Sequence, residues 1–283
     1  MINGKTRTCG LIGCPVEHTK SPLIHNTVAQ RMGVDLAYVP FHVKEGDLEA
    51  AIKGAKALNL LGLNVTVPYK SDVIPFLKEI DPLAAQIGAV NTLVAVDGGY
   101  KGFNTDMPGL YRAMMEDGVT IEGEQILILG AGGVARAVAL LVASKRAKEI
   151  TILNRTVEKA QAICSEVKGF YPEVEIKALA LGEYASLSAN SYLAIQATNI
   201  GMHPNIDEAV IEDASFYEKV HTGYDLVFNP AQTKFMKLVK AAGGRAFNGL
   251  KMLLYQGIIA YEYWTEKQVP AEVIEEVSGL LEE

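Results

Sequence analysis

Two charged side chains directly follow hydrophobic stretches of the sequence, where a folded chain can present them to a ligand. Residues 64–70 read N-V-T-V-P-Y-K, a short β-like run closed by proline, and Lys70 supplies an ammonium group just after it. Residues 103–106 read F-N-T-D and end on Asp106. An ammonium and a carboxylate are groups that general acid–base catalysis uses.

Amides and hydroxyls gather in the same part of the sequence. They lie in H-T-K-S-P (18–22), in N-V-T-V-P-Y-K and in A-V-N-T (89–92). Each has a structural explanation by itself, since Ser21 could cap a helix and Asn64 could tie two strands together. Together with an ammonium and a carboxylate, and without a set of metal ligands, they are typical of a site for a small polyhydroxylated molecule.

A glycine-rich stretch in the middle of the chain has the context of a dinucleotide-binding site. The near-continuous apolar run at 125–129 is typical of a strand buried on both faces of a parallel sheet, and the sequence G-A-G-G (130–133) follows it directly. A helix pattern at 134–144 and a strand pattern at 149–153 complete a β-α-β unit of about 30 residues. This order of strand, loop and helix is the one that a dinucleotide site requires.

The chemistry of this loop favours a pyrophosphate ligand. Gly130 permits a tight turn, and Gly132 lets the backbone approach the phosphates at the helix N-terminus, where free N–H groups meet their charge. Ala135 stands at the third position of the G-x-G-x-x-G pattern. The sequence therefore predicts that a dinucleotide binds here.

The end of the next strand indicates which dinucleotide binds. A carboxylate about 20 residues after the loop would select NAD, whereas a 2′-phosphate needs positive charge. This chain has Asn154, Arg155 and Thr156 there, with Lys159 one helical turn further on. Because the planar guanidinium of Arg155 can bind a phosphate and no carboxylate repels it, we predict NADP.

These residues must be positioned by alternating β and α patterns, which run from end to end of the chain. The first hundred residues favour an α/β domain with a largely parallel sheet, and the second half favours a Rossmann-like doubly wound sheet. Ser21, as a helix N-cap, and Pro22 begin one helix that Gly33 ends. Strands are predicted at 8–13, 36–43, 61–67, 92–96, 125–129, 149–153, 191–196 and 224–228. Helices are predicted at 21–33, 47–59, 72–79, 82–87, 107–118, 134–144, 248–264 and 270–281, with a turn at 97–99 and a connecting segment at 100–106.

Length and composition limit the classes of function. The chain has 283 residues, enough for about two domains. A net charge of -7 and a pI near 5.4 argue against nucleic acid or an anionic membrane as the main partner. The three cysteines lack Cys-x-x-Cys spacing, so they indicate neither a disulfide framework nor a zinc site and fit a reducing cytosol. With no signal-like N-terminus and no long apolar stretch, we expect a cytoplasmic protein.

Seven motifs in order resemble the shikimate dehydrogenase family from one end of the chain to the other. They are H-T-K-S-P-L-I-H-N, N-V-T-V-P-Y-K, G-A-V-N-T, N-T-D-M-P-G, G-A-G-G-V-A-R, N-R-T and N-G-L-K-M-L-L-Y-Q. The resemblance implies reversible, NADPH-dependent reduction of 3-dehydroshikimate to shikimate on the way to chorismate and the aromatic amino acids. It also implies a substrate domain at 1–106 plus 248–283, an NADP-binding domain at 107–247 and a cleft between them.

The resemblance also assigns residues by position. The family's lysine and aspartate fall on Lys70 and Asp106. Contacts to ring hydroxyls, or support for those contacts, fall on Asn64, Thr66, Asn91 and Gln256, while Thr19, Ser21 and the position of Phe228 belong to the substrate carboxylate. Cofactor positions fall on Gly130, Ala131, Gly132, Gly133, Val134, Asn154, Arg155, Thr156, Lys159, Leu226 and Gly249. The segment 198–202 is expected near the nicotinamide, and no metal is implied.

Four positions depart from the common family pattern. Thr19 replaces serine and adds a methyl group, and Phe228 replaces tyrosine and so cannot donate a hydrogen bond to the carboxylate. Cys14 replaces a frequent asparagine and Lys159 a frequent arginine. The first two departures concern the carboxylate end of the substrate, so they affect affinity there rather than the type of reaction.

The hypothesis for the chemistry is that Lys70 and Asp106 form a coupled acid/base pair, with Lys70 as the proton donor to the ketone oxygen. Three alternatives stay open: a quinate/shikimate dehydrogenase with dual substrate or NAD use, a folate-linked methylene dehydrogenase, and a nucleotide-sensing module without catalysis. The absence of an acidic neighbour of Arg155 argues against the first. The H-T-K-S-P and N-T-D clusters argue against the second, and the presence of both Lys70 and Asp106 against the third. A monomer or a homodimer is expected.

Overall fold

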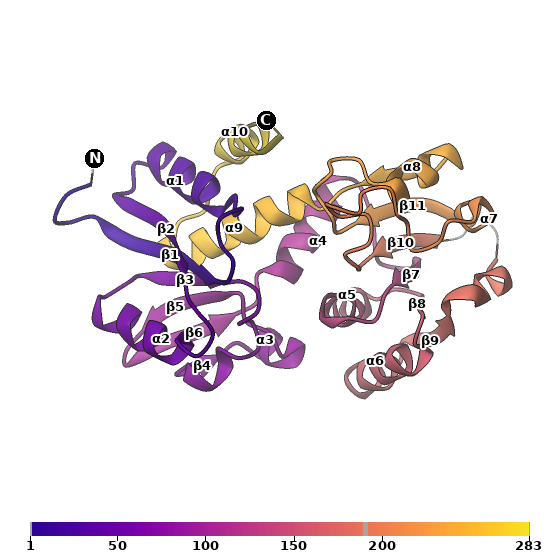
Figure 1. Ribbon diagram of the computed structural model, residues 1–283, viewed down its shortest axis with the longest axis horizontal. Helices are drawn as coiled ribbons and strands as arrows, with labels where there is room; N and C mark the ends of the chain where they lie inside the picture. Colours follow the sequence, from indigo (N-terminus) through magenta and orange to yellow (C-terminus); the bar gives the residue numbers. More distant parts are fainter. Residues whose placement is uncertain (1, 189–191, 283) are drawn as a thin grey trace. The chain divides into compact units, whose positions relative to one another are not determined.

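A computed structural model describes residues 2–188 and 192–282 and divides the chain into two compact units (Figure 1). The first unit consists of Met1–Leu110 and Leu253–Glu283, and the second of Tyr111–Met252. Each unit contains its own six-stranded sheet, so the predicted two-domain α/β fold is confirmed. No helix in the described part of the chain is both long and apolar enough to cross a membrane.

The first unit contains a mixed sheet in the order β2-β1-β3-β5-β6-β4. Its strands are β1 (Arg7–Gly13), β2 (Leu36–His42), β3 (Gly62–Val65), β4 (Glu79–Ile80), β5 (Thr92–Val96) and β6 (Gly99–Phe103). Its helices are α1 (Ser21–Arg31), α2 (Leu48–Ala57), the 3₁₀ turn η1 (Ile74–Phe76), α3 (Pro82–Ile87) and α10 (Ala271–Glu282), with parts of α4 (Asp106–Glu116) and α9 (Leu250–Thr265). Strand β1 is parallel to β2 and β3, whereas β5 is antiparallel to β3 and β6.

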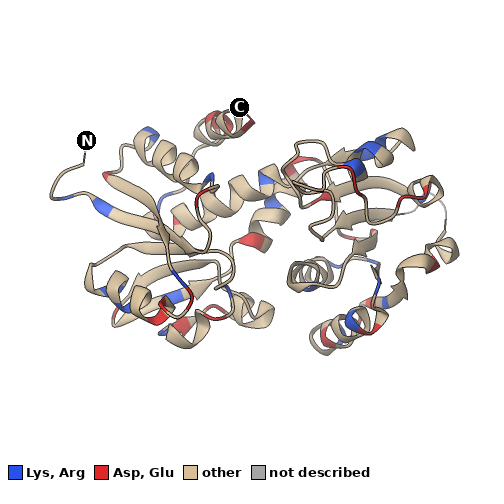
Figure 2. Cartoon of the chain, viewed as in Figure 1, with Lys and Arg blue, Asp and Glu red and all other residues tan. Residues whose placement is uncertain are grey.

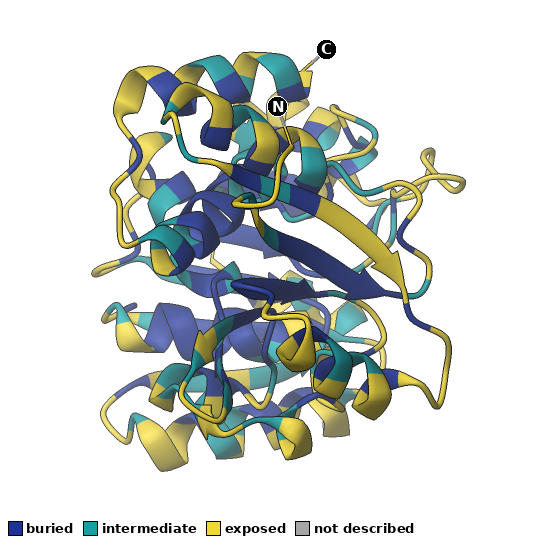
Figure 3. Cartoon of the chain, turned by 90° about the vertical axis from the view of Figure 1, so that its left-hand side faces the viewer, coloured by how far each residue is buried: buried dark blue, intermediate teal, exposed yellow. Residues whose placement is uncertain are grey.

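The two faces of this sheet have different roles. Leu63 and Val65 of β3 join the apolar cluster that α2 and α3 cover. Because side chains alternate along a strand, Gly62 and Asn64 point to the opposite face, which packs on α1 and α9. The buried strands lie dark between the helices in Figure 3, and the second half of edge strand β2 is exposed.

Two predictions for this unit are wrong. Residues 72–79 do not form an α-helix; Pro75 lies in the short turn η1, and the chain then pairs as β4 with β6 through Glu79 and Lys101. Residues 99–103, expected only to connect elements, form β6. The turn that precedes it uses Gly98 at φ 82°, which closes a hairpin between β5 and β6. In both cases pairing between strands decides the structure.

The second unit contains an all-parallel sheet in the order β12-β11-β10-β7-β8-β9, the strand order of the doubly wound dinucleotide-binding fold. Its strands are β7 (Gln125–Leu129), β8 (Glu149–Asn154), β9 (Glu175–Ala180), β10 (Tyr192–Gln196), β11 (Val220–Asp225) and β12 (Arg245–Phe247). Its other elements are α5 (Gly133–Ser144), α6 (Val157–Phe170), η2 (Leu181–Ser186), α7 (Ala214–Tyr217) and α8 (Lys234–Ala241). Helices α7 and α8 cover one apolar face, and α5 and α6 lie on the other (Figure 1).

Two strands of this unit, β10 and β11, are described with other bounds than predicted. The strand expected at 224–228 runs instead from Val220 to Asp225, because its neighbour β10 ends at Gln196, which pairs with Asp225. Leu226 and Phe228 therefore lie in the loop after the strand. The expected strand start at Ser191 lies outside the described residues, and β10 is described from Tyr192.

Lys and Arg are interspersed with Asp and Glu on the helices of both units (Figure 2).

Candidate active site

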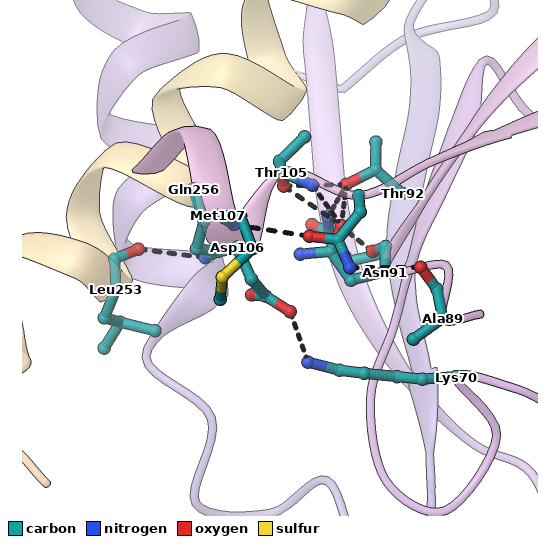
Figure 4. A network of polar contacts seen from close by, with 11 residues as sticks. Lys70, Ala89, Asn91, Thr92, Thr105, Asp106, Met107, Leu253 and Gln256 are labelled. Carbon is teal, nitrogen blue, oxygen red and sulfur yellow. Dashed lines mark hydrogen bonds and ion pairs between the residues drawn. The ribbon is translucent and has the colours of Figure 1, made fainter. Parts of the chain in front are cut away.

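Lys70 and Asp106 form an ion pair in the first unit. The Nζ atom of Lys70 lies 2.7 Å from Oδ2 of Asp106, and the two side chains point toward one another in Figure 4. The Lys70 side chain is 34% exposed and that of Asp106 18%. An ammonium has three N–H donors, so Lys70 can hold this contact and still donate to a ligand.

The turn after β3 fixes the position of Lys70. Tyr69 is buried in the apolar cluster under α2, and its hydroxyl donates to the carbonyl of Val43 at 2.8 Å. The carbonyl of Lys70 accepts from the N–H of Val90 at 2.8 Å. The lysine backbone is thus held on both sides while its side chain remains partly exposed.

Asp106 is positioned by amides at the start of α4. The Asn104 amide donates to the carbonyl of Ala89 at 3.0 Å, and its oxygen accepts from the N–H of Met107 at 3.3 Å. Asp106 is the first residue of α4, where the partial positive charge of a helix N-terminus stabilises a carboxylate. Asn104 was not among the predicted site residues; a buried amide just before a helix is the signal that could have identified it.

Asn91 connects β5 to the segment that carries Asp106. Its side-chain oxygen accepts from the N–H of Thr105 at 2.7 Å and from the hydroxyls of Thr105 and Thr92, each at 3.1 Å. This use of the oxygen turns the NH₂ group away from Thr105, and no hydrogen bond from that nitrogen occurs among the described residues. Asn91 thus supports the site through its oxygen and can offer its NH₂ group to a ligand.

Asn64 is a buried junction rather than an exposed contact. Its NH₂ group donates to the carbonyl of Asn91 and to Thr92 Oγ1, while its oxygen accepts from the Tyr38 hydroxyl at 2.8 Å. Only 4% of Asn64 is exposed. The Asn64 amide is thus used within the protein, whereas Thr66, two residues further on, is half-buried.

The same amide fixes the tautomer of a buried histidine. The backbone carbonyl of Asn91 can only accept a hydrogen bond, so the group of Asn64 that faces it must be the NH₂ group. The side-chain oxygen of Asn64 then faces His25 Nε2, at 3.2 Å. Nε2 must therefore carry the hydrogen. Complete burial lowers the pKa of His25 to about 3, so the ring is neutral at physiological pH. His25 and Tyr38 were not among the predicted site residues, although a polar residue on the buried face of an element is a recognisable signal.

Thr19 and Ser21 form a hydroxyl pair at the start of α1. Thr19 Oγ1 donates to Ser21 Oγ at 3.1 Å and accepts from the Ser21 N–H at 3.2 Å. The prediction that Ser21 is the N-cap is wrong, because Lys20 occupies that position and Ser21 is the first helical residue. Its hydroxyl instead accepts from Thr19 Oγ1, so the pair is closed by two hydrogen bonds.

Gln256 lies beside the start of α4 because two helices approach closely. A Cβ added to Gly109 would lie 2.6 Å from the backbone nitrogen of Gln256, so only glycine fits there. Gln256 is 9% exposed, and its amide donates to the carbonyl of Leu253 at 2.9 Å. The contact places Gln256 near Asp106, one turn before Gly109 on α4 (Figure 4).

The glycine loop of the second unit has the geometry that a pyrophosphate needs. Gly130 adopts φ 113°, and a Cβ there would lie 2.7 Å from Thr198 Cγ2, so both backbone and space require glycine. Gly132, the N-cap of α5, and Gly133 have open space where a side chain would be. No side chain caps this helix, so its first N–H groups can meet a phosphate. Ala131 and Val134 flank these glycines at the surface.

The residues expected to select NADP lie together after β8. Asn154 ends the strand, and its amide donates to the carbonyl of Thr156 at 2.8 Å. This turn presents Arg155 to solvent, and Lys159 is exposed on the first turn of α6. The two cations thus occupy the place where a carboxylate would exclude a 2′-phosphate.

Leu226 and Gly249 come together at the carboxyl end of β11. A Cβ on Gly249 would lie 2.3 Å from the carbonyl oxygen of Leu226, and the Gly249 N–H donates to Val227 at 3.1 Å. Phe228 follows in the same loop, with 38% of its surface exposed. In the same unit, the backbone of the 198–202 segment is held by Gln196, whose side-chain oxygen accepts from the N–H of Thr198 at 2.6 Å.

Asp225 anchors the loop after β11 directly, and it anchors the 198–202 segment through Gln196. Its carboxylate accepts from Thr233 Oγ1 at 2.6 Å, from the N–H of Val227 at 2.9 Å and from Gln196 Nε2 at 3.2 Å. All three partners donate, which suits an ionised carboxylate. Burial nevertheless raises the pKa of Asp225 from 3.8 to about 6.

We predict a pH-dependent effect of Asp225→Asn on stability. Because the pKa of Asp225 is raised in the folded state, the folded chain binds a proton between about pH 6 and pH 4 that the unfolded chain does not. This group therefore makes the free energy of unfolding rise as the pH falls through that window, by up to about 1.4 kcal/mol per pH unit. Urea unfolding at pH 7 and pH 5 measures the change in stability of each protein, and the change in the parent should be more favourable at pH 5 than the change in Asp225→Asn by about this amount.

The matched control is Asp213→Asn in the same unit. A hydrogen bond from Tyr184 lowers the pKa of Asp213, so its titration lies below the tested window. Asp213→Asn should therefore leave the difference between pH 7 and pH 5 as in the parent. An Asp225→Asn variant with the parental pH dependence would contradict the prediction.

No group of three or more His, Cys, Asp or Glu side chains suited to a metal ion occurs among residues 2–188 and 192–282.

Three family models together span most of the chain. The model described as "Shikimate dehydrogenase substrate binding domain" matches residues 11–93. The one described as "Shikimate / quinate 5-dehydrogenase" matches residues 113–245, and "Shikimate 5'-dehydrogenase C-terminal domain" matches residues 249–277.

Individual proteins agree with these matches. The chain is 42% identical over 279 residues to a shikimate dehydrogenase (NADP(+)) of Carboxydothermus hydrogenoformans, with 99% of each chain covered. Its fold is similar to that of Listeria monocytogenes shikimate 5-dehydrogenase in complex with shikimate and NAD, at TM-score 0.89, 32% identity and coverage of 98% and 97%. It is also similar to the Thermus thermophilus enzyme in complex with NADP(H) and shikimate, at TM-score 0.86, 29% identity and coverage of 98% and 100%.

Proposed function

This chain belongs to the shikimate dehydrogenase family, and from that premise we propose that it catalyses the reversible, NADPH-dependent reduction of 3-dehydroshikimate to shikimate. The product would enter the route to chorismate and the aromatic amino acids. The observation that carries the proposal is the 2.7 Å contact between Lys70 and Asp106 beside a set of amides and hydroxyls. We assign the substrate to residues 1–106 and 248–283, and the cofactor to residues 107–247.

Lys70 is the proton donor in this proposal. When bound, NADPH would supply the hydride for the ketone carbon, and negative charge would then develop on the ketone oxygen. A positioned ammonium stabilises that charge and then protonates the oxygen. Asp106 accepts one N–H of Lys70 and leaves the others for the substrate, and in the reverse direction the pair takes up the hydroxyl proton.

Amides and hydroxyls of the first unit recognise the remaining polar groups of the substrate. Asn91 and Gln256 are close to the Lys70–Asp106 pair in Figure 4 and suit ring hydroxyls, with Thr66 at the end of β3. Asn64 supports them from beneath, since both ends of its amide are already occupied.

We assign the substrate carboxylate to the hydroxyls of Thr19 and Ser21. Phe228, which the resemblance also places at the carboxylate, contributes only an apolar ring. Affinity at this end of the substrate therefore depends on two hydroxyl donors.

The cofactor is NADP(H), held at the pyrophosphate by the loop from Gly130 to Val134 and at the 2′-phosphate by Arg155, with Asn154, Thr156 and Lys159 around it. The open space at Gly132 and Gly133 supports the first assignment, and the exposed cations support the second. Leu226 and Gly249 belong to the cofactor side by resemblance.

The test of the proposed function is an assay of NADPH oxidation with 3-dehydroshikimate, repeated with NADH and with 3-dehydroquinate. We expect turnover with NADPH and 3-dehydroshikimate to exceed the other combinations. Comparable turnover with 3-dehydroquinate or NADH would indicate a quinate/shikimate dehydrogenase instead. Absence of ketone-dependent oxidation would leave a nucleotide-binding protein without catalysis.

Arg155→Ala should weaken the preference for NADPH. Charge-assisted hydrogen bonds to a phosphate contribute about 1.5–3 kcal/mol, so we expect the KM for NADPH to rise about 10- to 100-fold. The KM for NADH, which lacks the 2′-phosphate, should change little. Steady-state kinetics with both cofactors measures the two values.

Lys168→Ala provides the control for lost surface charge, because Lys168 is exposed near the far end of α6. It should leave both cofactor constants unchanged. An equal rise of the two KM values in Arg155→Ala would mean that Arg155 does not recognise the 2′-phosphate.

A further inference from the structure

Three side chains of the first unit form a hydrogen-bonded row to which the proposed function assigns no role. Cys14 Sγ lies 3.3 Å from His42 Nε2, and His42 Nδ1 lies 3.2 Å from Glu17 Oε1. Cys14 is half-buried, whereas the His42 and Glu17 side chains are 43% and 61% exposed. A thiol, an imidazole and a carboxylate in this order are the parts of an activated nucleophile.

Strand register brings these residues together. Strands β1 and β2 are parallel with Gly13 opposite His42, so Cys14 follows at the same edge of the sheet. The N–H of Cys14 donates to the carbonyl of Val67 at 3.0 Å, which fixes the cysteine backbone. Glu17 is fixed as well, because its Oε2 accepts from the N–H of Val16 at 3.0 Å and leaves Oε1 for His42.

The hydrogen bonds determine where the protons lie. Hydrogen bonds from its own backbone N–H and from His42 lower the pKa of Glu17, so it is an ionised, acceptor-only carboxylate near neutral pH. His42 must therefore carry its hydrogen on Nδ1. In the neutral ring the Nε2 atom is then an acceptor, and the Cys14 thiol is the donor in the 3.3 Å contact.

We propose that Cys14 is a reactive thiol and a modification site for small disulfides and alkylating agents, with His42 as its general base and Glu17 as the residue that orients His42. In reaction with a disulfide, the thiol proton moves to His42 Nε2 and the sulfur attacks one sulfur of the reagent. One S–S bond breaks, one forms, and the departing thiolate takes up a proton. The disulfide is itself the oxidant, and one equivalent of thiol is released.

The other two cysteines provide a contrast within the same chain. Cys9 is fully buried in β1, and burial raises its pKa to about 12. Cys164 on α6 is half-buried, and burial raises its pKa to about 11. Both stay protonated near neutral pH, where the thiol is a poor nucleophile.

The test is the rate of modification of each cysteine in the native full-length chain at pH 7, with iodoacetamide and with cystamine, read by peptide mass spectrometry. Rates for the chain unfolded in guanidinium chloride correct for the intrinsic reactivity of each peptide. We expect Cys14 to react at least about ten-fold faster than Cys164 and Cys9. A Cys14 rate no higher than that of Cys164 would overturn the proposal.

Variants of His42 and Glu17 distinguish activation of the Cys14 thiol from simple exposure of that thiol. His42→Gln should slow Cys14 about ten-fold or more, and Glu17→Gln should slow it less, while the Cys164 rate stays constant as the internal standard. Because His42 and Glu17 are exposed, neither change disturbs the core, and circular dichroism checks this. An unchanged Cys14 rate in His42→Gln would show that exposure alone governs the reaction.

The effect of Cys14 modification on enzyme activity is a second measurement, which rests on the proposed function and is independent of the modification rates. Cys14 begins the segment that leads to Thr19 and Ser21, so cystamine treatment should raise the KM for shikimate several-fold and leave the KM for NADP⁺ unchanged. Cys14→Ser should be insensitive to cystamine. If the chain had no dehydrogenase activity, the proposed function would fail while the modification rates would still decide the role of Cys14.

Discussion

Lys70→Ala should lower kcat by about 10²- to 10⁴-fold, because general acid–base groups contribute rate factors of this size. The substitution removes the ammonium that stabilises and protonates the ketone oxygen. NADPH binding should be unaffected, since the glycine loop and Arg155 belong to the second unit and Lys70 to the first. Steady-state kinetics with 3-dehydroshikimate gives kcat, and fluorescence titration of NADPH gives the affinity for the cofactor.

The control for loss of a lysine charge in the same unit is Lys53→Ala. Lys53 pairs with Glu49 on the exposed face of α2, and its side chain is 75% exposed. This variant should keep parental kcat and KM. Near-normal turnover of Lys70→Ala with the cofactor still bound would show that Lys70 is not the proton donor.

Asp106→Asn distinguishes proton transfer from positioning. The amide keeps the shape of the side chain and an oxygen that can accept from Lys70, but it removes the negative charge. A variant that lowers kcat and kcat/KM equally has lost an interaction made only in the transition state, whereas a rise in KM alone indicates ground-state binding. We expect the first result, because Asp106 contacts Lys70 directly at 2.7 Å.

Trp264→Ala should lower the free energy of unfolding of the first unit by about 3–5 kcal/mol, the range for removing a large aromatic side chain from a core. Trp264 is the single tryptophan of the chain and is 3% exposed. It packs against His25 and Tyr38, with ring centroids 5.0 Å and 5.9 Å away. Its indole N–H donates to the carbonyl of Leu93 at 2.8 Å, which connects α9 to β5.

Gly62 makes this contact possible. A Cβ at Gly62 would lie 2.0 Å from Trp264 Nε1, so the indole occupies the space that a side chain on β3 would take. Trp264→Ala therefore opens a cavity beside a residue that cannot fill it. It also leaves the carbonyl of Leu93 without its donor, which adds to the cost.

Two controls accompany Trp264→Ala: one separates the lost hydrogen bond from the lost apolar contact, and the other is a surface substitution. Trp264→Phe keeps much of the apolar contact and removes the N–H, so it should cost less, about 1–3 kcal/mol. Leu58→Ala changes a residue that is 76% exposed in the same unit and should stay within about 0.5 kcal/mol. Guanidinium unfolding followed by far-UV circular dichroism, with separate transitions allowed for the two units, measures all three. A loss for Trp264→Ala no larger than that for Leu58→Ala would contradict the prediction.

The dinucleotide unit was predictable because its signals are local. The apolar run of β7, the G-A-G-G loop and α5 are adjacent in the sequence, and each restricts the next. Arg155 follows β8 directly, so the preference for NADP could be argued before any strand pairing was known. The glycine requirement at position 130 is likewise a property of the local backbone, which adopts φ 113° there.

Predictions for the first unit failed where pairing between distant segments decides the structure. The 72–79 segment has an apolar pattern compatible with a helix, yet β6 offers it a strand partner. Residues 99–103, expected only to connect elements, pair with β5 across the hairpin. In each case a strand partner replaced the local preference.

The sequence by itself determined the two-domain α/β class, the dinucleotide loop, the charge that selects the cofactor and the identity of the Lys70 and Asp106 candidates. Only the tertiary structure decided which groups meet: Lys70 with Asp106, Asn64 with His25 and Tyr38, and Cys14 with His42. The physical reason is that residue type and spacing fix local conformation, whereas hydrogen-bond partners and burial depend on strand register and helix packing between segments far apart in the chain.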